Sequence, residues 1–147
     1  MSASVQHYLS FRVGRQWYGV HVDQIIEVLH LLALTELPAA PPEILGLMTV
    51  RDMVMPVVDL RRRFGLGEAP LRLDTPIIAV RTPRGPIGLV VDEAEDVERI
   101  PAHLIAAHDG DDSPYITGVA RLSDRLLLLL DTARLRAETR VPEHPPG

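Results

Sequence analysis

Short apolar runs, each ended by turn-forming residues, occupy most of the chain. Tyr8–Val13 and Trp17–Val22 are rich in aromatic and β-branched residues and flank Gly14–Gln16, which predicts an antiparallel hairpin. Three further pairs of runs follow the same plan: 45–50 with 54–58, 77–80 with 88–91, and 116–122 with 126–130. The pattern therefore predicts a mainly β fold of many short strands.

Helices are predicted to be few and short. The segments 60–64 and 132–137 each follow an aspartate, Asp59 and Asp131, whose side chain can cap the first turn by accepting a backbone N–H. The run Leu126–Leu130 is apolar throughout, which predicts a strand covered on both faces.

Two parts of the chain share one pattern. Gly19–Asp23 followed by Glu27–Val28 matches Gly88–Asp92 followed by Asp96–Val97 at one constant offset (19 to 88, 27 to 96). At a second, nearly equal offset (44 to 116, 59 to 131), another set of positions matches in the same order: Ile44, Gly46, Asp52 and Asp59 with Ile116, Gly118, Asp124 and Asp131. These matches indicate a β-rich unit of roughly 70 residues used twice. We expect each copy to form a small five-stranded barrel that packs on the other, because so small a barrel is marginally stable alone.

Composition narrows the class of protein. The 147 residues are 46% hydrophobic and 24% charged, which suits one globular domain with a real core. No apolar run approaches the roughly 20 residues of a membrane span, and the N-terminus lacks the pattern of a signal peptide, so we expect a cytoplasmic protein without membrane insertion. The net charge of −5 disfavours nucleic acid as a partner. The absence of cysteine excludes disulfides, thiolate metal sites and cysteine nucleophiles. We predict one domain over 1–139 and a flexible tail over 140–147.

Candidate catalytic and metal sites are weak. The chain has no G-x-S-x-G, P-loop or H-E-x-x-H motif, and the acidic loop Asp109–Asp112 fails the spacing of a calcium loop. His21 and Asp23 share a face of a predicted strand, and we interpret them as an edge polar pair because no nucleophile accompanies them.

Several carboxylates also have structural interpretations. Glu93, Glu95, Asp96 and Glu98 are interpreted as a solvated face around a turn. Asp23, Asp59, Asp92 and Asp131 hold equivalent places in the two copies, which predicts capping and turn formation rather than catalysis. We therefore expect no cofactor, no metal and no enzyme, and a function in binding.

Three segments carry a family resemblance. They are Tyr8–Asp23 with Glu27-Val28, then Pro42-x-x-x-Gly46 through Arg51 to Pro56-Val-Val-Asp-Leu60-Arg, then Gly88–Asp92 with Asp96-Val97. Together they resemble the CheW family of chemotaxis coupling proteins, over about Tyr8 to Leu135. The resemblance implies two SH3-like five-stranded β-barrel lobes packed about a shared hydrophobic core. It also implies a non-enzymatic adaptor that joins a histidine kinase regulatory domain to the cytoplasmic tip of methyl-accepting chemoreceptors, associated with membrane receptor arrays through these partners.

The resemblance also implies a receptor-binding groove between the lobes. Matched by motif, its residues are Ile25, Glu27, Gly46, Arg51, Gly88, Ala94 and Val97. The apolar members would contact a receptor helix, the glycines would permit close approach, and Arg51 with Glu27 would set orientation. Ordinary packing is the alternative for the apolar members and glycines, and a salt bridge to Asp52 or Asp59 is the alternative for Arg51. The kinase surface is placed only broadly, on turns such as those around Pro56 and Leu126.

Two departures from the family pattern leave the pathway open. The family's Asn-Leu-Arg-Gly turn reads Thr49–Asp52 here, so an aspartate must adopt a conformation that favours glycine. Leu29–Leu34 is unusually apolar, either as an exposed partner surface or as a strand crossing between the lobes. The chain can thus be a flagellar chemotaxis adaptor or a diverged regulator of another chemosensory pathway, such as one for type IV pili, that binds kinase without receptor. A small hydrolase that uses His21 is a third, weaker alternative.

Overall fold

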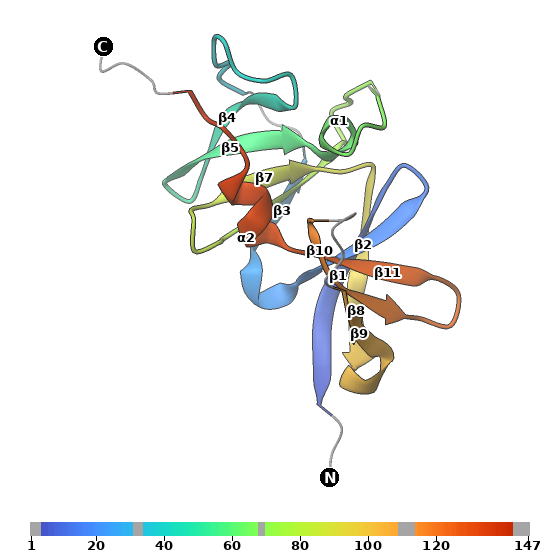
Figure 1. The fold of residues 1–147 in the computed structure, drawn as a ribbon. Coiled ribbons are helices and arrows are strands. Elements are labelled where there is room, and N and C mark those ends of the chain that lie inside the picture. Colours follow the sequence, from blue (N-terminus) through green and yellow to red (C-terminus); the bar gives the residue numbers. More distant parts are fainter. Residues whose placement is uncertain (1–3, 31–33, 68–69, 109–113, 143–147) are drawn as a thin grey trace.

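The computed structural model describes residues 4–30, 34–67, 70–108 and 114–142. The fold is mainly β with short helices, as predicted (Figure 1). In chain order its elements are β1 (Val5–Val13), β2 (Gln16–His21), η1 (Val22–Gln24), β3 (Ile25–His30), β4 (Ile44–Val50), β5 (Met53–Asp59), α1 (Leu60–Arg63), β6 (Pro76–Val80), β7 (Ile87–Val90), β8 (Glu93–Pro101), η2 (Ala102–Leu104), β9 (Ile105–Ala107), β10 (Ile116–Arg121), β11 (Leu126–Leu130) and α2 (Thr132–Ala137).

The strands form two sheets, each of which curls into a lobe. The six-stranded lobe has the order β8-β1-β2-β11-β10-β9, and the five-stranded lobe has the order β3-β6-β7-β5-β4. Neighbouring strands are antiparallel except for β2 with β11 and β5 with β7, which are parallel. In Figure 1 the five-stranded lobe lies above the six-stranded lobe, with the N-terminus at the bottom and the C-terminus at the top.

The two sequence copies are present in the structure, but neither copy is a lobe. The first copy supplies β1 to β5 and the second supplies β6, β7, β8, β10 and β11. Each sheet takes the first two strands of one copy and three later strands of the other, so that β3-β6-β7-β5-β4 is equivalent to β8-β1-β2-β11-β10. The six-stranded sheet has β9 as an additional strand beside β10. The expectation of one barrel per copy is thereby corrected: each lobe needs strands from both copies. The physical reason is that β1 pairs with β8, and β3 with β6, across the copies.

Registers repeat along with the strand order. Leu9 pairs with Val97 as Ile78 pairs with Val28, and the parallel strands match Leu129 to Gly19 as they match Val57 to Gly88. Bulges also recur at equivalent places, between Ile44 and Gly46 in β4 and between Ile116 and Gly118 in β10. The two constant offsets in the sequence therefore mark a true structural pseudo-repeat.

The core has three parts because alternate residues of a strand face opposite ways. A shared core between the lobes includes Phe11 and Val20 from one sheet and Ile78 and Leu89 from the other. The interior of the five-stranded lobe contains Met55, Val57, Ile77, Val90 and four further buried side chains. The interior of the six-stranded lobe is smaller, built from Ile100, Ala120, Leu127 and Leu129. The shared core confirms the expected packing of two β lobes.

Both helices begin where the sequence predicts. The side chain of Asp59 accepts an N–H from Arg61 at 3.0 Å, and that of Asp131 accepts one from Arg134 at 3.0 Å. Each helix then reaches the lobe that its preceding strand does not belong to. Phe64, after α1, stacks on Tyr18 of β2 with ring centroids 5.3 Å apart, and Arg136 of α2 donates to the Pro86 carbonyl before β7 at 3.1 Å.

Some of the remaining local predictions are confirmed, and others are corrected or lie outside the described residues. The four hairpins are confirmed, and β11 is covered on both faces except at Leu126, which is 52% exposed. Residues 93–98, expected around a turn, instead lie in edge strand β8. The chain crosses between the lobes at η1, not within 29–34, whose residues 31–33 lie outside the described part of the structure. Asp109–Asp112 and most of the predicted tail, from residue 143 on, also lie outside the described residues.

Candidate functional site

The seven residues expected to face a receptor lie on both lobes. Ile25 and Glu27 are in β3, Gly46 in β4 and Gly88 in β7, all in the five-stranded lobe, and Arg51 is in the turn after β4. Ala94 and Val97 lie in β8, at the edge of the six-stranded lobe. The structure joins two of them directly, Arg51 and Glu27.

The Arg51–Glu27 ion pair connects opposite edges of one sheet. The Nε of Arg51 lies 3.1 Å from Oε1 of Glu27, and their side chains are 65% and 39% exposed. Arg51 follows edge strand β4, whereas Glu27 is in β3 at the other edge, so the pair helps to close the curled sheet. Neither of the alternative partners, Asp52 or Asp59, forms this bond. Because the pair is largely solvated, its contribution to stability is small.

The turn that carries Arg51 has an unusual backbone. Arg51 and Asp52 have φ values of 49° and 66°, and they form a two-residue link between Val50 and Met53, which pair with each other. Two successive residues in the left-handed region are typical of the tight turn that suits a twisted hairpin. As expected, Asp52 adopts the conformation for which glycine is the usual residue. The local strain fixes where Arg51 leaves the sheet.

The two glycines of the expected site contact the chain itself. Gly46 has a φ of 151°, and a Cβ built there would lie 2.6 Å from the Thr35 carbonyl oxygen. The close approach serves the bridge between Thr35 and Leu47. Gly88 is buried, and a Cβ there would lie 2.7 Å from Cε of Met48. Internal packing thus accounts for the missing side chain at both positions.

The apolar members differ in exposure. Ile25 and Ala94, which are equivalent in the repeat, are half-buried against the shared core. Val97 is 51% exposed, and its equivalent Val28 is 45% exposed. Val28 belongs to the family motif but was not among the expected groove residues, although the constant offset to Val97 would have identified it. Each edge strand, β3 and β8, thus presents one exposed valine.

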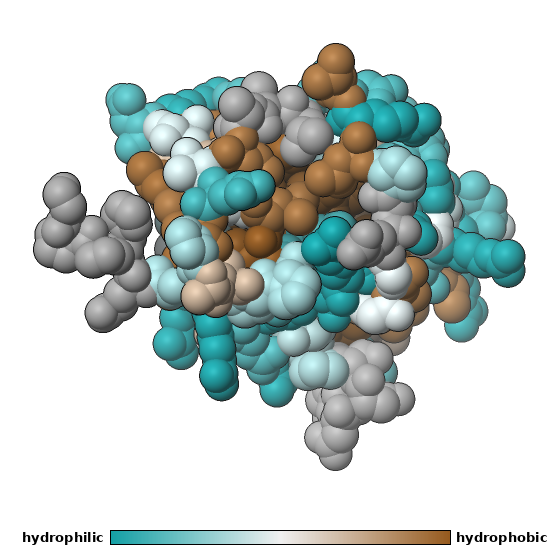
Figure 2. All heavy atoms as spheres, turned by 90° about the horizontal axis from the view of Figure 1, so that it is seen from above, coloured by the Kyte–Doolittle hydropathy of each residue, from teal (hydrophilic) through white to brown (hydrophobic). Residues whose placement is uncertain are grey.

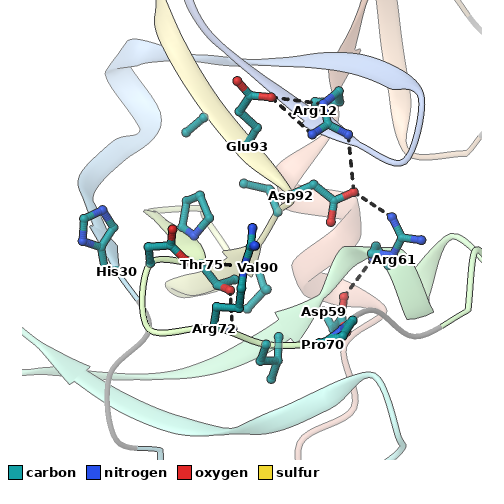
Figure 3. A pocket seen from close by; sticks show the side chains of 15 residues that line it. Arg12, His30, Asp59, Arg61, Pro70, Arg72, Thr75, Val90, Asp92 and Glu93 are labelled. Carbon is teal, nitrogen blue, oxygen red and sulfur yellow. Dashed lines mark hydrogen bonds and ion pairs between the residues drawn. The ribbon is translucent and has the colours of Figure 1, made fainter.

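A charged cavity of about 730 Å³ lies where the lobes meet (Figure 3). Of the seven expected residues only Ala94 lines it. Its walls come from β1, β8, the start of α1 and the segment before β6, and its lining includes Arg12, Asp59, Arg61, Arg72, Asp92 and Glu93. The lining of this cavity differs from the apolar groove expected from the sequence, because the connection from β7 to β8 places carboxylates here.

Asp92 is the centre of the charged network. Its Oδ2 accepts the Gly14 N–H at 2.6 Å and Nη1 of Arg61 at 2.7 Å, and lies 3.9 Å from Nη1 of Arg12. Arg12 also binds Glu93 at 3.2 Å. Asp92 therefore ties the β1–β2 turn of one lobe to α1, which follows a strand of the other. Sequence reasoning placed Asp92 only among turn residues, because its partners are far away in the chain.

Asp59 lines the same cavity and is nearly fully buried. Burial raises the pKa of its carboxyl group, and the N–H of Arg61 and the charge of Arg62 oppose that rise. The Arg62 Nε lies 3.6 Å from Oδ2 of Asp59. Asp59 is thus both the helix cap that the sequence predicts and a group whose ionisation is coupled to folding.

An apolar cleft of about 330 Å³ lies on another part of the lobe junction. It is lined by Tyr18, Arg63, Phe64, Pro114, Tyr115, Ile116 and Leu128. Phe64 stacks on Tyr18 and lies 6.2 Å from the ring of Tyr115.

Figure 2, seen from above the five-stranded lobe, shows apolar side chains gathered in the middle of that face and ringed by polar ones. Exposed apolar surface of this kind is typical of protein-binding faces.

The candidate chemical groups have structural roles. His21 accepts the Asp23 N–H on Nδ1 at 3.2 Å and faces Oε1 of Gln6 from Nε2 at 2.9 Å, so it caps η1. Glu95 and Glu98 both bind Arg125, at 3.2 and 3.3 Å. In the part of the chain that the structure describes, no group of three or more metal-ligating side chains occurs. Within that same part, no helix is long and apolar enough to cross a membrane.

The region suggested for kinase contact is partly redefined. Pro56 is not in a turn: it is buried within β5 and paired with Leu47. Leu126 does follow a turn, and it is exposed at the start of β11.

Comparison with known proteins gives concordant results. The model of the CheW-like domain matches residues 7–140. Protein FrzA of Myxococcus xanthus is 34% identical over 146 residues, covering 92% of this chain and 91% of the relative. The chemotaxis protein CheW of Bacillus subtilis is 30% identical over 125 residues, covering 82% and 80%. The crystal structure of the scaffolding protein TtCheW from Thermoanaerobacter tengcongensis superimposes with a TM-score of 0.83 at 26% identity, covering 90% of this chain and 92% of that one.

Proposed function

The chain belongs to the CheW-like domain family, and from this premise we propose which of its surfaces perform the function of the family. It is a chemotaxis scaffold that couples receptors to a kinase, and it is not an enzyme. The proposal is that the Arg51–Glu27 corner, with the exposed edge of β3, binds the helical tip of a methyl-accepting chemoreceptor. A separate surface binds the regulatory domain of a histidine kinase.

One observation supports this placement more than any other. Arg51 is held by a strained turn at the outer edge of the fold and pairs with Glu27 largely in solvent. The pair contributes little to stability, since its two side chains are 65% and 39% exposed. A charged pair fixed in position at an open edge suits a partner that carries charges of its own. Val28, the next residue of β3 after Glu27, and Val54 in β5 are 45% and 61% exposed and add apolar surface to the five-stranded lobe.

The scaffold function also requires that two partners be bound at once. The two lobes have equivalent strand orders but different surface side chains, so one fold offers two unlike faces. Binding of unlike faces to different partners is heterologous and can extend into an array. Each contact can then be weak, because linkage within the array raises the effective concentration.

The test is a pull-down with two separate baits, a receptor-tip fragment and a kinase regulatory domain. We expect the full chain to bind both. Arg51→Ala should lower the affinity for the receptor-tip fragment by about tenfold or more, since hot-spot arginines in interfaces have effects of this order. Its thermal transition should move little, because an exposed ion pair is worth roughly 0.2–1 kcal/mol.

Arg134→Ala is the matched control. Arg134 of α2 and Glu138, the residue at the C-cap of that helix, form an ion pair of similar exposure, 53% and 42%, at 3.3 Å. The control should leave both partners bound. Loss of stability in Arg51→Ala instead would assign Arg51 a structural role, and binding of the kinase bait alone by the unaltered chain would favour the diverged regulator.

A further inference from the structure

We propose that Asp52 is a specificity-determining residue of the receptor-binding corner, which selects receptor tips that carry a lysine or arginine. This inference deepens the function proposed above and rests on it. It concerns which receptors the chain prefers, whereas the preceding proposal concerns where receptors bind.

The turn fixes the direction in which the Asp52 side chain leaves the backbone. With a φ of 66°, Asp52 is the second of two left-handed residues in a link that has only two residues. Such a link has few backbone alternatives, so the carboxylate stays at the tip of the β4–β5 hairpin. Aspartate is among the few residues that tolerate this conformation. The direction of its side chain is therefore set by the backbone and not by a partner side chain.

The charges at this corner do not balance. The guanidinium of Arg51 is engaged by Glu27 at 3.1 Å. Asp52 is exposed and has no ion pair with any residue in the described ranges. Two carboxylates and one guanidinium leave one negative charge unmatched at the edge of the proposed interface. Charges at the rim of an interface act mainly on partner choice and association rate.

The chemistry of the occupant follows from this imbalance. A helix laid across the corner would place a basic side chain against Asp52, and an acidic one there would be repelled. Val54, two residues further along the same hairpin, is 61% exposed and offers apolar contact next to the charge. The corner thus fits an amphipathic receptor helix with a lysine or arginine close to an apolar residue.

The second sequence copy provides a built-in comparison. Asp124 is equivalent to Asp52 and is also exposed, but it lies in a longer link between Arg121 and Leu126. Neither Asp124 nor Ser123, which stands where Arg51 does, has a positive φ. Ser123 also brings no charge to the turn. Both equivalent turns therefore carry an exposed aspartate. Within the described residues, however, only the turn at 51–52 combines this aspartate with a two-residue link of positive φ and an unmatched negative charge.

The test uses the full chain and a soluble receptor-tip helical hairpin that carries a lysine at its exposed face, together with the lysine-to-glutamate form of that hairpin. Asp52→Asn should bind the lysine hairpin about two- to five-fold more weakly at low salt, the range expected for an exposed ion pair. The difference should shrink at about 0.5 M salt. Asp52→Arg should bind it about tenfold more weakly through like-charge repulsion. Asp124→Asn is the matched control and should bind as the unaltered chain does.

The outcomes separate the two proposals. If the unaltered chain binds neither hairpin, the receptor-binding proposal fails. If it binds the lysine hairpin and Asp52→Asn binds equally well at all salt concentrations, the receptor-binding proposal stands and the role of Asp52 is overturned. Asp52→Gly guards against misfolding, because glycine adopts the same backbone without strain; it should lose the same affinity as Asp52→Asn. Equal discrimination between the two hairpins by Asp52→Asn and the unaltered chain would also contradict the inference.

Discussion

The two lobes have the same strand order but differ in how they are held at their junctions. The chain passes from one lobe to the other through η1 on one side and through Asp92 on the other. At the first junction Asp23 is exposed and its side chain lies 3.6 Å from His21. At the second, the equivalent Asp92 joins Gly14 and Arg61 across the lobes. One junction is therefore pinned by partly buried charge, whereas the other is held by an exposed pair.

The features that the copies share are those of the backbone. Gly19 and Gly88 lie at equivalent points in the parallel pairs, and a Cβ at either would collide with a neighbouring side chain at 2.9 or 2.7 Å. Bulges and helix caps also recur. The side chains at the turns and junctions have diverged. The two copies therefore share the residues that the two-lobe backbone requires. Their surface side chains differ, which allows the two lobes to bind different partners.

The largest effect is expected from cutting the chain between its two copies. A protease site inserted after Leu66 would lie between Gly65 and Gly67. A Cβ built at either glycine meets no atom within 4 Å, so the insertion has open space around it. Because each lobe contains strands of both copies, we expect the cut halves to remain together in size-exclusion chromatography. Unfolding should become concentration-dependent. At micromolar protein the free energy of unfolding should fall by about 4 kcal/mol, which corresponds to the ratio between a millimolar effective concentration and a micromolar real one.

A site of the same length inserted in the β10–β11 turn, at Ser123, is the control, since a cut there separates two strands of one copy. Separation of the halves after the cut at Leu66, without denaturant, would contradict the exchange of strands between lobes.

The next effect is expected at the bulge glycines. Gly46→Ala places a Cβ 2.6 Å from a backbone oxygen at a φ of 151°, so both a collision and backbone strain oppose it. We expect a loss of about 3 kcal/mol in the free energy of unfolding, measured with urea. Gly118→Ala meets the Ala106 oxygen at 3.0 Å without a positive φ, and should lose about 1 kcal/mol. Equal losses would show that the two bulges are under equal constraint.

How far the sequence alone reaches depends on the range of the interaction. Hairpins, the caps Asp59 and Asp131, and the repeat were predictable, since each is set by residues close together or by a constant offset. The exchange of strands between lobes was not, because pairing of β1 with β8 joins residues far apart in the chain, for example Leu9 with Val97. Local pattern does not specify which of two similar partners a strand pairs with.

The same limit applies to the candidate site. Arg51 was expected to be functional, and its place in a turn was predictable from its neighbours. Its bond to Glu27 was not, because the bond joins opposite edges of a curled sheet. The charged cavity was missed for a related reason: Arg12, Arg61 and Asp92 belong to three separate segments, and each alone resembles an ordinary surface residue.

A moderate effect is expected from removing the pinned junction. Asp92→Ala leaves the Gly14 N–H and the Arg61 guanidinium without their acceptor, and should cost about 2 kcal/mol. Asp23→Ala, at the equivalent place, should change stability by less than about 0.5 kcal/mol because Asp23 is 85% exposed. Chemical denaturation of both variants measures the contrast. A loss from Asp23→Ala as large as that from Asp92→Ala would remove the difference between the junctions.

The smallest effect concerns the pH dependence of stability at Asp59. Burial raises the pKa of this carboxyl group above its ordinary value of 3.8, so the folded protein binds the proton more tightly than the unfolded chain does. As the pH rises from about 3.8 through the raised pKa, the unfolded chain ionises first and the contribution of Asp59 to stability falls. Asp59→Asn keeps a capping side chain but has no such dependence. The stability of Asp59→Asn relative to the unaltered chain should therefore increase with pH across this window, as urea titrations at several pH values would measure.

The control is Asp131→Asn, which makes the same exchange at the equivalent cap and measures the cost of the exchange itself. A relative stability that falls with pH would mean that the Arg61 N–H and the charge of Arg62 outweigh burial.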